Sequence, residues 1–504
     1  MKSTSEYRTD IEYNFGYFSQ LNIQRMRLAF LNVGLDYPDV LNACELGFGQ
    51  GVSINIHAAG NSSSNWYGND FNPSHAAFAQ GLNSQACGSA LLTDQSFEIF
   101  CAREDLPDFQ FIGIHGVWSW ISDDNRHHLL GFLKRKLALG GVLYLSYNTL
   151  PGWTGVAPLR HLLSRFAETM EPSEDILKRV GSSLEFVQDF FEVSPQFSQA
   201  YPQAKRRVKQ LLGEDRTYLA HEFFNTHWRP EYFAEVSDCL CPTKCSFACS
   251  ADLLDHFESI NMNPEQQLFY SGIQNPFLKQ VLFDFIVNQG FRRDYWVKGP
   301  VRMEPIRLGA LKKAHRVILT CHRDEMPSSL TGRLGRVKLD MSIYGPVLSV
   351  LENYRIVAVG EIEASLRGSG ITAEQIFQAI VMLSGIGVVQ SAQEDEIIEA
   401  SIKTSHALNQ ELIQRSRSNG NIPFLCSPVT GGGILVSRTS QLFLLAIYSG
   451  KETPEEWAEL VSQYSRLSGQ ASYEASEIPA EKLIDQARDF SEKQLPMLKA
   501  LRVI

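Results

Sequence analysis

The residues with the clearest chemical meaning are one acid and three alternating glycines near the start of the chain. The stretch ELGFGQG contains Glu45, Gly47, Gly49 and Gly51. Because glycine is costly to order, three in alternation indicate a loop whose backbone passes close to a ligand. The spacing is G-x-G-x-G, and Val52 occupies the position of the third glycine of the dinucleotide-binding fingerprint. The Glu45 carboxylate would repel a pyrophosphate, whereas it would pair with an amino group.

A loop of this kind suits a ligand that carries an amino group and a carboxylate on the same carbon atom. The ligand carboxylate would meet the loop N–H groups and the positive end of the helix that follows. The ligand amino group would meet Glu45. The methionine end of S-adenosyl-L-methionine has this chemistry, so we predict it as the cofactor. The alternative is an α/β fold that binds no such ligand.

Polar side chains after the next two predicted strands supply the rest of the cofactor site. Asp70 follows the second strand, where an acid can accept both ribose hydroxyl groups, and Phe71 beside it is expected to pack on the adenine. Asp94 and Gln95 follow the third strand and are expected to bind the adenine amino group. Each of these is also a common loop residue. Acids at the carboxyl ends of three successive strands favour a binding site.

Short apolar runs alternate with helical stretches over the first third of the chain, which is typical of a parallel sheet. The predicted strands are residues 40–46, 65–70, 90–94, 109–116 and 142–148. The predicted helices are residues 52–60, 73–82 and 123–141, the last capped by Asp123 or Asp124.

The rest of the chain predicts a helical insertion and a separate C-terminal region. Residues 150–158 are rich in proline and glycine, and residues 158–220 are polar with a helical period. Two later strands, 245–251 and 291–299, are interpreted as the missing members of the same sheet. After residue 305, short helices joined by a turn indicate a winged-helix-like module for packing or dimerisation. Gly431, Gly432 and Gly433 are interpreted as a turn.

Several of these stretches resemble a known family. ELGFGQG with WYGNDFNPSHAAFAQ resembles the class I S-adenosylmethionine-dependent methyltransferases. YLAHEFFNTHWRPEYFAEV with FRRDYWVKGPVRM resembles the methyltransferase regulatory domain of a bacterial subfamily, and LALGGVLYLSYNTLPGW resembles its fifth strand and loop. That subfamily includes protein-lysine methyltransferases of rickettsiae. The resemblance covers residues 10–305 and implies methyl transfer, with a lysine side chain of a protein as acceptor.

The resulting fold prediction is an α/β chain in three parts. Residues 1–154 form N-terminal helices and the Rossmann-like, class I methyltransferase core. Residues 155–304 form a helical cap and the regulatory domain, which completes the sheet. Residues 305–504 form an α-rich, winged-helix-like region.

Methyl transfer from an activated donor mainly requires that the acceptor be aligned and water excluded. His115 follows the fourth strand and is expected beside the cofactor. We expect the aromatic rings of Trp118, Trp120 and Trp153 to wall the acceptor channel. Tyr147 and Asn148 are expected to orient the acceptor. His221 or Glu222 is expected to serve as a base or as a polar group of the pocket. Any one tryptophan is as easily a packing residue, and Glu222 is as easily a surface charge.

Composition limits the partners and the location. The formal net charge of −10 over 504 residues argues against a nucleic-acid binder and is compatible with a basic protein segment as partner. The chain has no predicted signal peptide or membrane span, so a cytoplasmic protein is expected. A homodimer is left open. The alternatives to a protein-lysine methyltransferase are a methyltransferase for a small molecule or glycan and, less favoured, a non-catalytic adapter that binds the cofactor.

Four of the nine cysteines lie close together, at positions 239, 241, 245 and 249. A zinc site would need all four ligands from one short segment without paired C-x-x-C motifs. We therefore predict no metal, and packing within a strand for Cys245 and Cys249.

Overall fold

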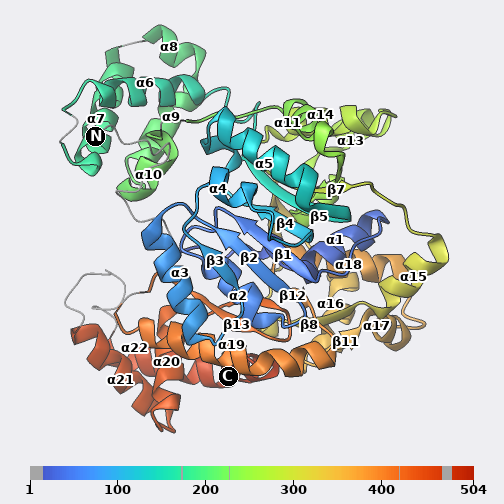
Figure 1. Cartoon of the computed structure of the whole chain (residues 1–504). Coiled ribbons are helices and arrows are strands. Elements are labelled where there is room, and N and C mark those ends of the chain that lie inside the picture. The colour runs from blue at the N-terminus through green and yellow to red at the C-terminus, as the bar shows by residue number, and fades with distance from the viewer. Residues whose placement is uncertain (1–14, 172–173, 194, 226, 419, 468–478) are drawn as a thin grey trace.

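A seven-stranded sheet forms the centre of the computed structural model (Figure 1). The residues that the structure describes are 15–171, 174–193, 195–225, 227–418, 420–467 and 479–504. The strand order is β3-β2-β1-β4-β5-β7-β6, and β7 alone runs antiparallel to its neighbours. The strands are β1 Asn42–Leu46, β2 Asn65–Asn69, β3 Leu91–Thr93, β4 Phe109–Ile114, β5 Leu137–Asn148, β6 Cys245–Ser250 and β7 Phe291–Lys298. The prediction that two late segments complete the sheet is confirmed.

Helices cover both faces of this sheet. On one face lie α1 (Ile23–Val33), preceded by the 3-10 turn Ser19–Leu21, and α2 (Val52–Gly60) and α3 (Pro73–Gln85). On the other face lie α4 (Phe97–Ala102), α5 (Asp123–Lys136) and α11 (Phe233–Leu240). Because both faces are covered, the central strands β1, β4 and β5 consist mainly of apolar residues and do not alternate strictly with polar ones.

The helix predicted over 123–141 begins at Asp123, but its predicted capping residue and its predicted end are wrong. Ser122, not Asp123 or Asp124, caps α5 by accepting a hydrogen bond from Asn125 N–H. The helix ends at Lys136, and the following apolar residues already belong to β5, where Leu137 pairs with Phe109. Gly140 and Gly141 therefore do not end the helix but lie inside the irregular first part of this strand.

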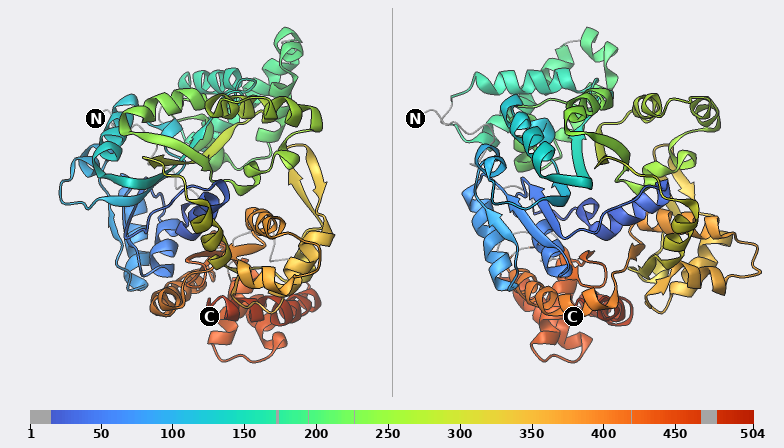
Figure 2. Two further views of the ribbon diagram at one scale, coloured as in Figure 1. Left: turned by 90° about the vertical axis from the view of Figure 1, so that its right-hand side faces the viewer. Right: turned by 45° about the vertical axis from the view of Figure 1, so that its right-hand side comes forward.

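The helical cap stands at one end of the molecule, away from the sheet (Figures 1 and 2). It comprises α6 Ala157–Glu168, α7 Ile176–Val193, α8 Pro195–Ala200, α9 Pro202–Leu211 and α10 Arg216–Phe223. The cap has a hydrophobic core of its own, which includes Leu163, Val180, Val187 and Leu211. The cap is therefore an insertion between β5 and the later strands of the sheet.

The segment from β6 to β7 supplies two strands of the sheet and the helices that connect them. It contains α12 Glu258–Asn261, α13 Pro264–Ser271 and α14 Pro276–Val287. Cys245 and Cys249 are buried in β6, as predicted, whereas Cys239 is half-buried and Cys241 is exposed. Among the described residues, no group of three or more His, Cys, Asp or Glu side chains is placed to hold a metal ion.

The C-terminal region packs against α1, α2 and α3, on the side of the sheet opposite α5 (Figure 1). Its strands are β8 Arg316–Leu319, β9 Ser329–Gly332, β10 Gly335–Lys338, β11 Val357–Ala358, β12 Val389–Ser391, β13 Phe424–Ser427 and β14 Gly432–Leu435. Its helices are α15 Pro305–Ala314, α16 Met341–Leu351, α17 Val359–Ser365, α18 Ala373–Gly385, α19 Asp395–Arg415, α20 Arg438–Tyr448, α21 Pro454–Leu467, α22 Ala480–Asp489 and α23 Leu495–Ala500.

Two parts of this region bear on the sequence predictions. Helices α17 and α18 lie along the chain between strands of the small antiparallel sheet β11-β8-β12, in the stretch for which the sequence predicts a winged-helix-like module. Gly431 lies in a turn, as predicted, but Gly432 and Gly433 belong to β14, which pairs with β13. Within the described residues, no helix combines the length and the hydrophobicity that a bilayer crossing requires.

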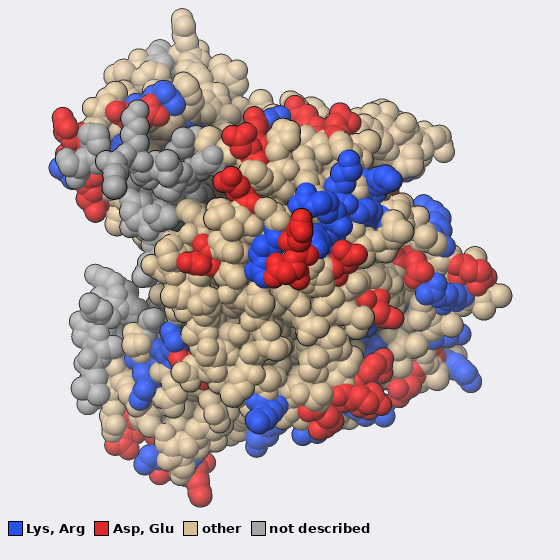
Figure 3. Space-filling view, in the orientation of Figure 1, with Lys and Arg blue, Asp and Glu red and all other residues tan. Residues whose placement is uncertain are grey.

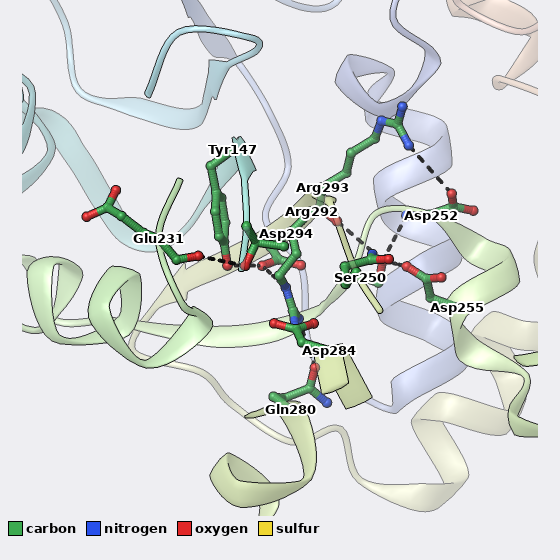
Figure 4. A network of polar contacts seen from close by, with 12 residues as sticks. Tyr147, Glu231, Ser250, Asp252, Asp255, Gln280, Asp284, Arg292, Arg293 and Asp294 are labelled. Carbon is green, nitrogen blue, oxygen red and sulfur yellow. Dashed lines mark hydrogen bonds and ion pairs between the residues drawn. The ribbon is translucent and has the colours of Figure 1, made fainter. Parts of the chain in front are cut away.

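A buried arginine on β7 joins helix α14 to the sheet (Figure 4). Arg292 of β7 donates from Nε to Asp294 (2.8 Å) and from Nη1 to Asp284 of α14 (2.7 Å). Its Nη2 donates to Gln280 (2.9 Å), and the Tyr147 hydroxyl donates to Asp294 (2.9 Å). The charge is thus compensated on every side, which a buried ion requires.

We predict that Arg292→Met lowers the free energy of unfolding by about 3–5 kcal/mol, because two buried carboxyl groups lose their counter-charge. Urea denaturation followed by circular dichroism measures this. The matched control is Arg293→Met, since Arg293 is partly exposed and lies 3.7 Å from Asp252, and its expected cost is about 1 kcal/mol or less. Equal losses in the two variants would contradict the prediction.

Candidate active site

A cavity of about 530 Å³ lies at the carboxyl ends of β1, β2 and β4. Open α/β sheets bind their ligands at this edge. The wall combines the glycine loop with residues from α3, α4 and α5 and from the segment before α1. The lining residues are Gly16, Phe18, Gly47, Phe48, Gly49, Gln50, Gly51, Asn69, Asp70, Phe71, His75, Ser96, Phe97, Glu98, His115, Gly116, Val117, Trp120, Ile121, Asp124, Asn125, His127 and His128.

The glycine loop needs its glycines, as the sequence predicted. Gly47, Gly49 and Gly51 all have positive φ, at 75°, 59° and 69°, a region that other residues rarely adopt. A Cβ atom on Gly47 would lie 2.6 Å from Val117 Cγ2, and one on Gly51 would overlap Ala79. The loop therefore brings its backbone directly against the cavity, at the N-terminus of α2.

Asp70 is the central acid of the wall. Its Oδ2 accepts a hydrogen bond from Gly49 N–H at 2.9 Å, and its Oδ1 accepts one from Asn72 N–H at 3.0 Å. His75 Nδ1 lies 3.2 Å from Oδ1. The Asp70 carboxylate thus joins the end of β2 to the glycine loop after β1. Phe71 lies next to it in the wall.

His115 forms the floor of the cavity beside β4. Its Nδ1 lies 2.8 Å from the Tyr144 hydroxyl, and its ring stacks on Phe18 with 3.5 Å between centroids. Burial, with a contribution from the charge of Arg293, lowers the pKa of His115 to about 3. The imidazole is therefore neutral at physiological pH, and it adds no positive charge to the cavity.

Glu45 lies beneath the glycine loop and is not among the lining residues. It is 1% exposed, and its Oε2 has no hydrogen-bond partner. Burial, with a smaller contribution from the nearby charge of Asp70, raises the pKa of Glu45 to about 8. A cation bound near the loop would relieve this unfavourable ionisation.

Two of the predicted adenine contacts lie outside the wall. Asp94 is exposed, and Gln95 has its side-chain Oε1 buried without a partner while its carbonyl accepts from Asn69 Nδ2 at 2.9 Å. The wall at this point is built by Ser96, Phe97 and Glu98, one to three residues further along the chain.

Of the aromatic candidates after β4 and β5, only Trp120 lines the cavity. Trp118 is fully buried beneath α5 and donates from Nε1 to Glu231 at 2.8 Å. Tyr147 is also core, because its side chain points to the face covered by α11 and bonds Asp294. Trp153 packs against the cap and donates from Nε1 to the Gly290 carbonyl at 2.9 Å.

The remaining catalytic candidates also lie elsewhere. Asn148 is buried at the end of β5, with its Nδ2 unpartnered, and does not line the cavity. Glu222 lies on cap helix α10, where burial raises its pKa to about 7 against the opposing effect of Arg160. The side chain of His221 lies outside the part of the structure that is described.

Sequence reasoning missed several wall residues, namely Phe18, His75, Phe97, Glu98, Asp124, His127 and His128. The position of His75 in the first turn of α3, five residues after Asp70, was a usable signal. Asp124, His127 and His128 share one face of α5 through their i, i+3 and i+4 spacing. Phe18 had no local signal, because it reaches the cavity only through the fold.

The residues present fit S-adenosylmethionine. The glycine loop offers close backbone N–H groups at a helix N-terminus, and Asp70 offers an acceptor at the second strand. Buried polar atoms without partners, Glu45 Oε2 and His75 Nε2, flank this part of the site. Unpartnered buried polar groups are costly, so their presence at this edge is expected where a polar ligand binds.

Comparisons with known proteins agree with this geometry. A family model described as a predicted methyltransferase regulatory domain matches residues 215–298. The Synechocystis protein sll1526 is 32% identical over 507 residues, which cover 99% of each chain. The structure of PKMT2 from Rickettsia typhi in complex with AdoHcy aligns with a TM-score of 0.70 and 15% identity, covering 98% of this chain and all of that one.

The chain belongs to the same family as sll1526, and its fold is that of PKMT2. A weaker relative, the Rickettsia prowazekii protein RP789, is 26% identical over 266 residues, which cover 51% of this chain and 46% of RP789. The predicted class I fold and regulatory domain are confirmed.

We predict that Asp70→Ala weakens binding of S-adenosylmethionine to the protein by about 1.5–3 kcal/mol, because charge-assisted hydrogen bonds are lost. Isothermal titration calorimetry measures the affinity. The matched control is Asp94→Ala, which removes an exposed acid outside the wall and is expected to change the affinity less than twofold. A comparable loss in Asp94→Ala would instead place Asp94 on the adenine.

We also predict that binding of S-adenosylmethionine releases close to one proton at pH 7. Glu45, with a pKa of about 8, is mostly protonated in the free protein, and the positive ligand favours its ionised form. Affinity should therefore rise with pH between about 6 and 8. Calorimetry in buffers of different ionisation enthalpy counts the released protons. Glu45→Gln should abolish the release, and an unchanged release in this variant would exclude Glu45 as its source.

Proposed function

We propose that this methyltransferase transfers the methyl group of S-adenosylmethionine to the side-chain nitrogen of lysine residues in a protein. The observation that carries the proposal is the charge of the cavity wall. Asp70, Glu98 and Asp124 contribute three carboxylates, and the described wall contains no lysine or arginine. Glu98 and Asp124 are exposed. An acidic mouth attracts a cationic side chain and disfavours an anionic one.

The cofactor is proposed to bind along the glycine loop. Gly47, Gly49 and Gly51 would approach its carboxylate, and Asp70 its ribose hydroxyl groups. Phe71 and Phe97 would enclose the adenine. When bound, S-adenosylmethionine supplies a methyl group already activated on a sulfonium.

The acceptor is proposed to enter between Phe18, His115 and Trp120. A free lysine has a pKa of about 10.4, so its amine must lose a proton before it can act as a nucleophile. Aromatic walls exclude water and favour the neutral amine. His115 is held neutral, so it does not oppose positive charge at the reacting centre. We propose that the proton leaves to solvent at the mouth, where Glu98 and Asp124 lie.

We propose that residues 1–154 bind the cofactor, that residues 155–304 form the cap and the regulatory domain, and that residues 305–504 form the C-terminal region. The cap, which has its own core, would help to hold the protein substrate.

The protein is proposed to act in the cytoplasm. On the face seen in Figure 3, acidic and basic side chains are interspersed rather than gathered by sign.

The proposal predicts which fraction of a cell lysate becomes labelled. Incubation with the protein and S-adenosylmethionine labelled in the methyl group should yield methylated lysine in proteins, identified by mass spectrometry. Activity should rise toward alkaline pH, because more of the acceptor amine is neutral. Label confined to low-mass products would overturn the lysine proposal and favour a small-molecule or glycan acceptor.

The acidic mouth gives the same proposal a second readout. In the double variant Glu98→Gln, Asp124→Asn, we expect KM for the protein acceptor to rise about 3- to 10-fold at low salt, with little change in kcat. The difference should shrink as salt is added. The matched control is Glu104→Gln, an exposed acid just beyond the other end of α4. An unchanged KM in the double variant would contradict a cationic acceptor at this mouth.

A further inference from the structure

A second cavity, of about 310 Å³, lies where the start of α1 meets the C-terminal region. One side is formed by Gln20, Gln24 and Arg25, and the other by Ser384 at the end of α18 and Gln390 in β12. It shares no lining residue with the cofactor cavity. Most of its lining residues are of polar types, with Leu28, Leu254, Ile386 and Val389 among the apolar ones.

Arg25 is the unusual member of this wall. Its Nη1 donates to the Ser384 carbonyl at 3.0 Å, and its Nε is buried without a partner. Among the described residues, no carboxylate lies within ion-pair distance of it. Asp252 also lines the cavity, but its carboxylate accepts from Leu254 N–H and lies 3.7 Å from Arg293. A partly buried guanidinium with no counter-charge is costly.

Hydrogen-bond donors surround this guanidinium. Ser384 is 4% exposed, and its hydroxyl has no partner in the structure. Gln24 is 7% exposed, and its amide, like those of Gln20 and Gln390, belongs to the cavity wall. A guanidinium with nearby hydroxyl and amide groups matches the acceptor oxygens of a phosphate or a carboxylate, which arginine binds through two parallel hydrogen bonds.

We infer that this cavity is a binding site for a small anion that bears a phosphate or carboxylate group. The anion provides the counter-charge that Arg25 lacks and accepts hydrogen bonds from Ser384 and the glutamine amides. The cavity volume limits the ligand to the size of a small metabolite. The site stands next to the cofactor cavity, because Tyr17 lines one and its neighbour Phe18 lines the other.

The test is calorimetric titration of the full-length protein with inorganic phosphate and, separately, with succinate. We expect saturable binding of at least one of them with one site per chain. Arg25→Gln should weaken it at least tenfold. The matched control is Arg27→Gln on the same helix, because Arg27 already pairs with exposed Asp39 at 3.1 Å. The affinity of this variant for the anion should be unchanged. Saturation with S-adenosylhomocysteine should leave the binding in place.

A second variant guards against misfolding of Arg25→Gln. Gln390→Glu is nearly isosteric and places a carboxylate in the wall, so it should abolish anion binding. S-adenosylhomocysteine affinity and the melting temperature report whether each variant is folded. The inference is overturned if neither anion binds the wild type, if the folded variants bind as well as the wild type, or if S-adenosylhomocysteine displaces the anion.

Discussion

The hydrogen bond from Gly49 N–H to the Asp70 carboxylate is the contact on which the cofactor cavity depends. It ties the loop after β1 to the end of β2, and Asn72 and His75 hold the same carboxylate from the other side. These donors satisfy the carboxylate oxygens of Asp70, which is only 7% exposed. The loop can then adopt positive φ at three glycines and present its backbone to a ligand. The same charge disfavours ionisation of Glu45 beneath the loop.

The cavity is completed by segments that are distant along the chain. Phe18 stacks on His115, and its neighbour Tyr17 packs against the hairpin β13–β14 of the C-terminal region. A Cβ atom on Gly433 would lie 3.0 Å from the Tyr17 ring, so the glycines of this hairpin permit the close approach. Asn22 Nδ2 donates to the Thr430 carbonyl at 3.0 Å. The C-terminal region thus positions the segment that carries Phe18, and it shapes the cofactor cavity without lining it.

Local patterns predicted the parts of the site that depend on local geometry. The glycine loop, Asp70, Phe71 and His115, which the sequence predicted, line the cavity because each follows a strand directly. Tyr147 and Trp118 lie in the core instead. Tyr147 is on β5, which is buried on both faces, so hydrophobicity did not show which side it takes, and Trp118 is in the 3-10 turn after β4, where no strand period sets its direction. Tyr144 and Ser146 contact His115, and Tyr147, one residue on, points the opposite way. Glu98 lies in the first turn of α4 and follows no strand directly, so no local pattern singled it out.

Two neighbouring arginines on β7 place their charges on opposite faces of the sheet. Arg292 and Arg293 are neighbours on β7 and point to opposite sides: Arg292 is held by Asp284 and Asp294, and Arg293 lies near Asp252. Neither guanidinium lines the cofactor cavity, although Arg293 is close enough to lower the pKa of His115. The cavity therefore keeps carboxylates and a neutral imidazole while the nearby positive charges are compensated outside it. Such a site stabilises a positively charged ligand, such as a sulfonium, by fixed charges that need no rearrangement on binding.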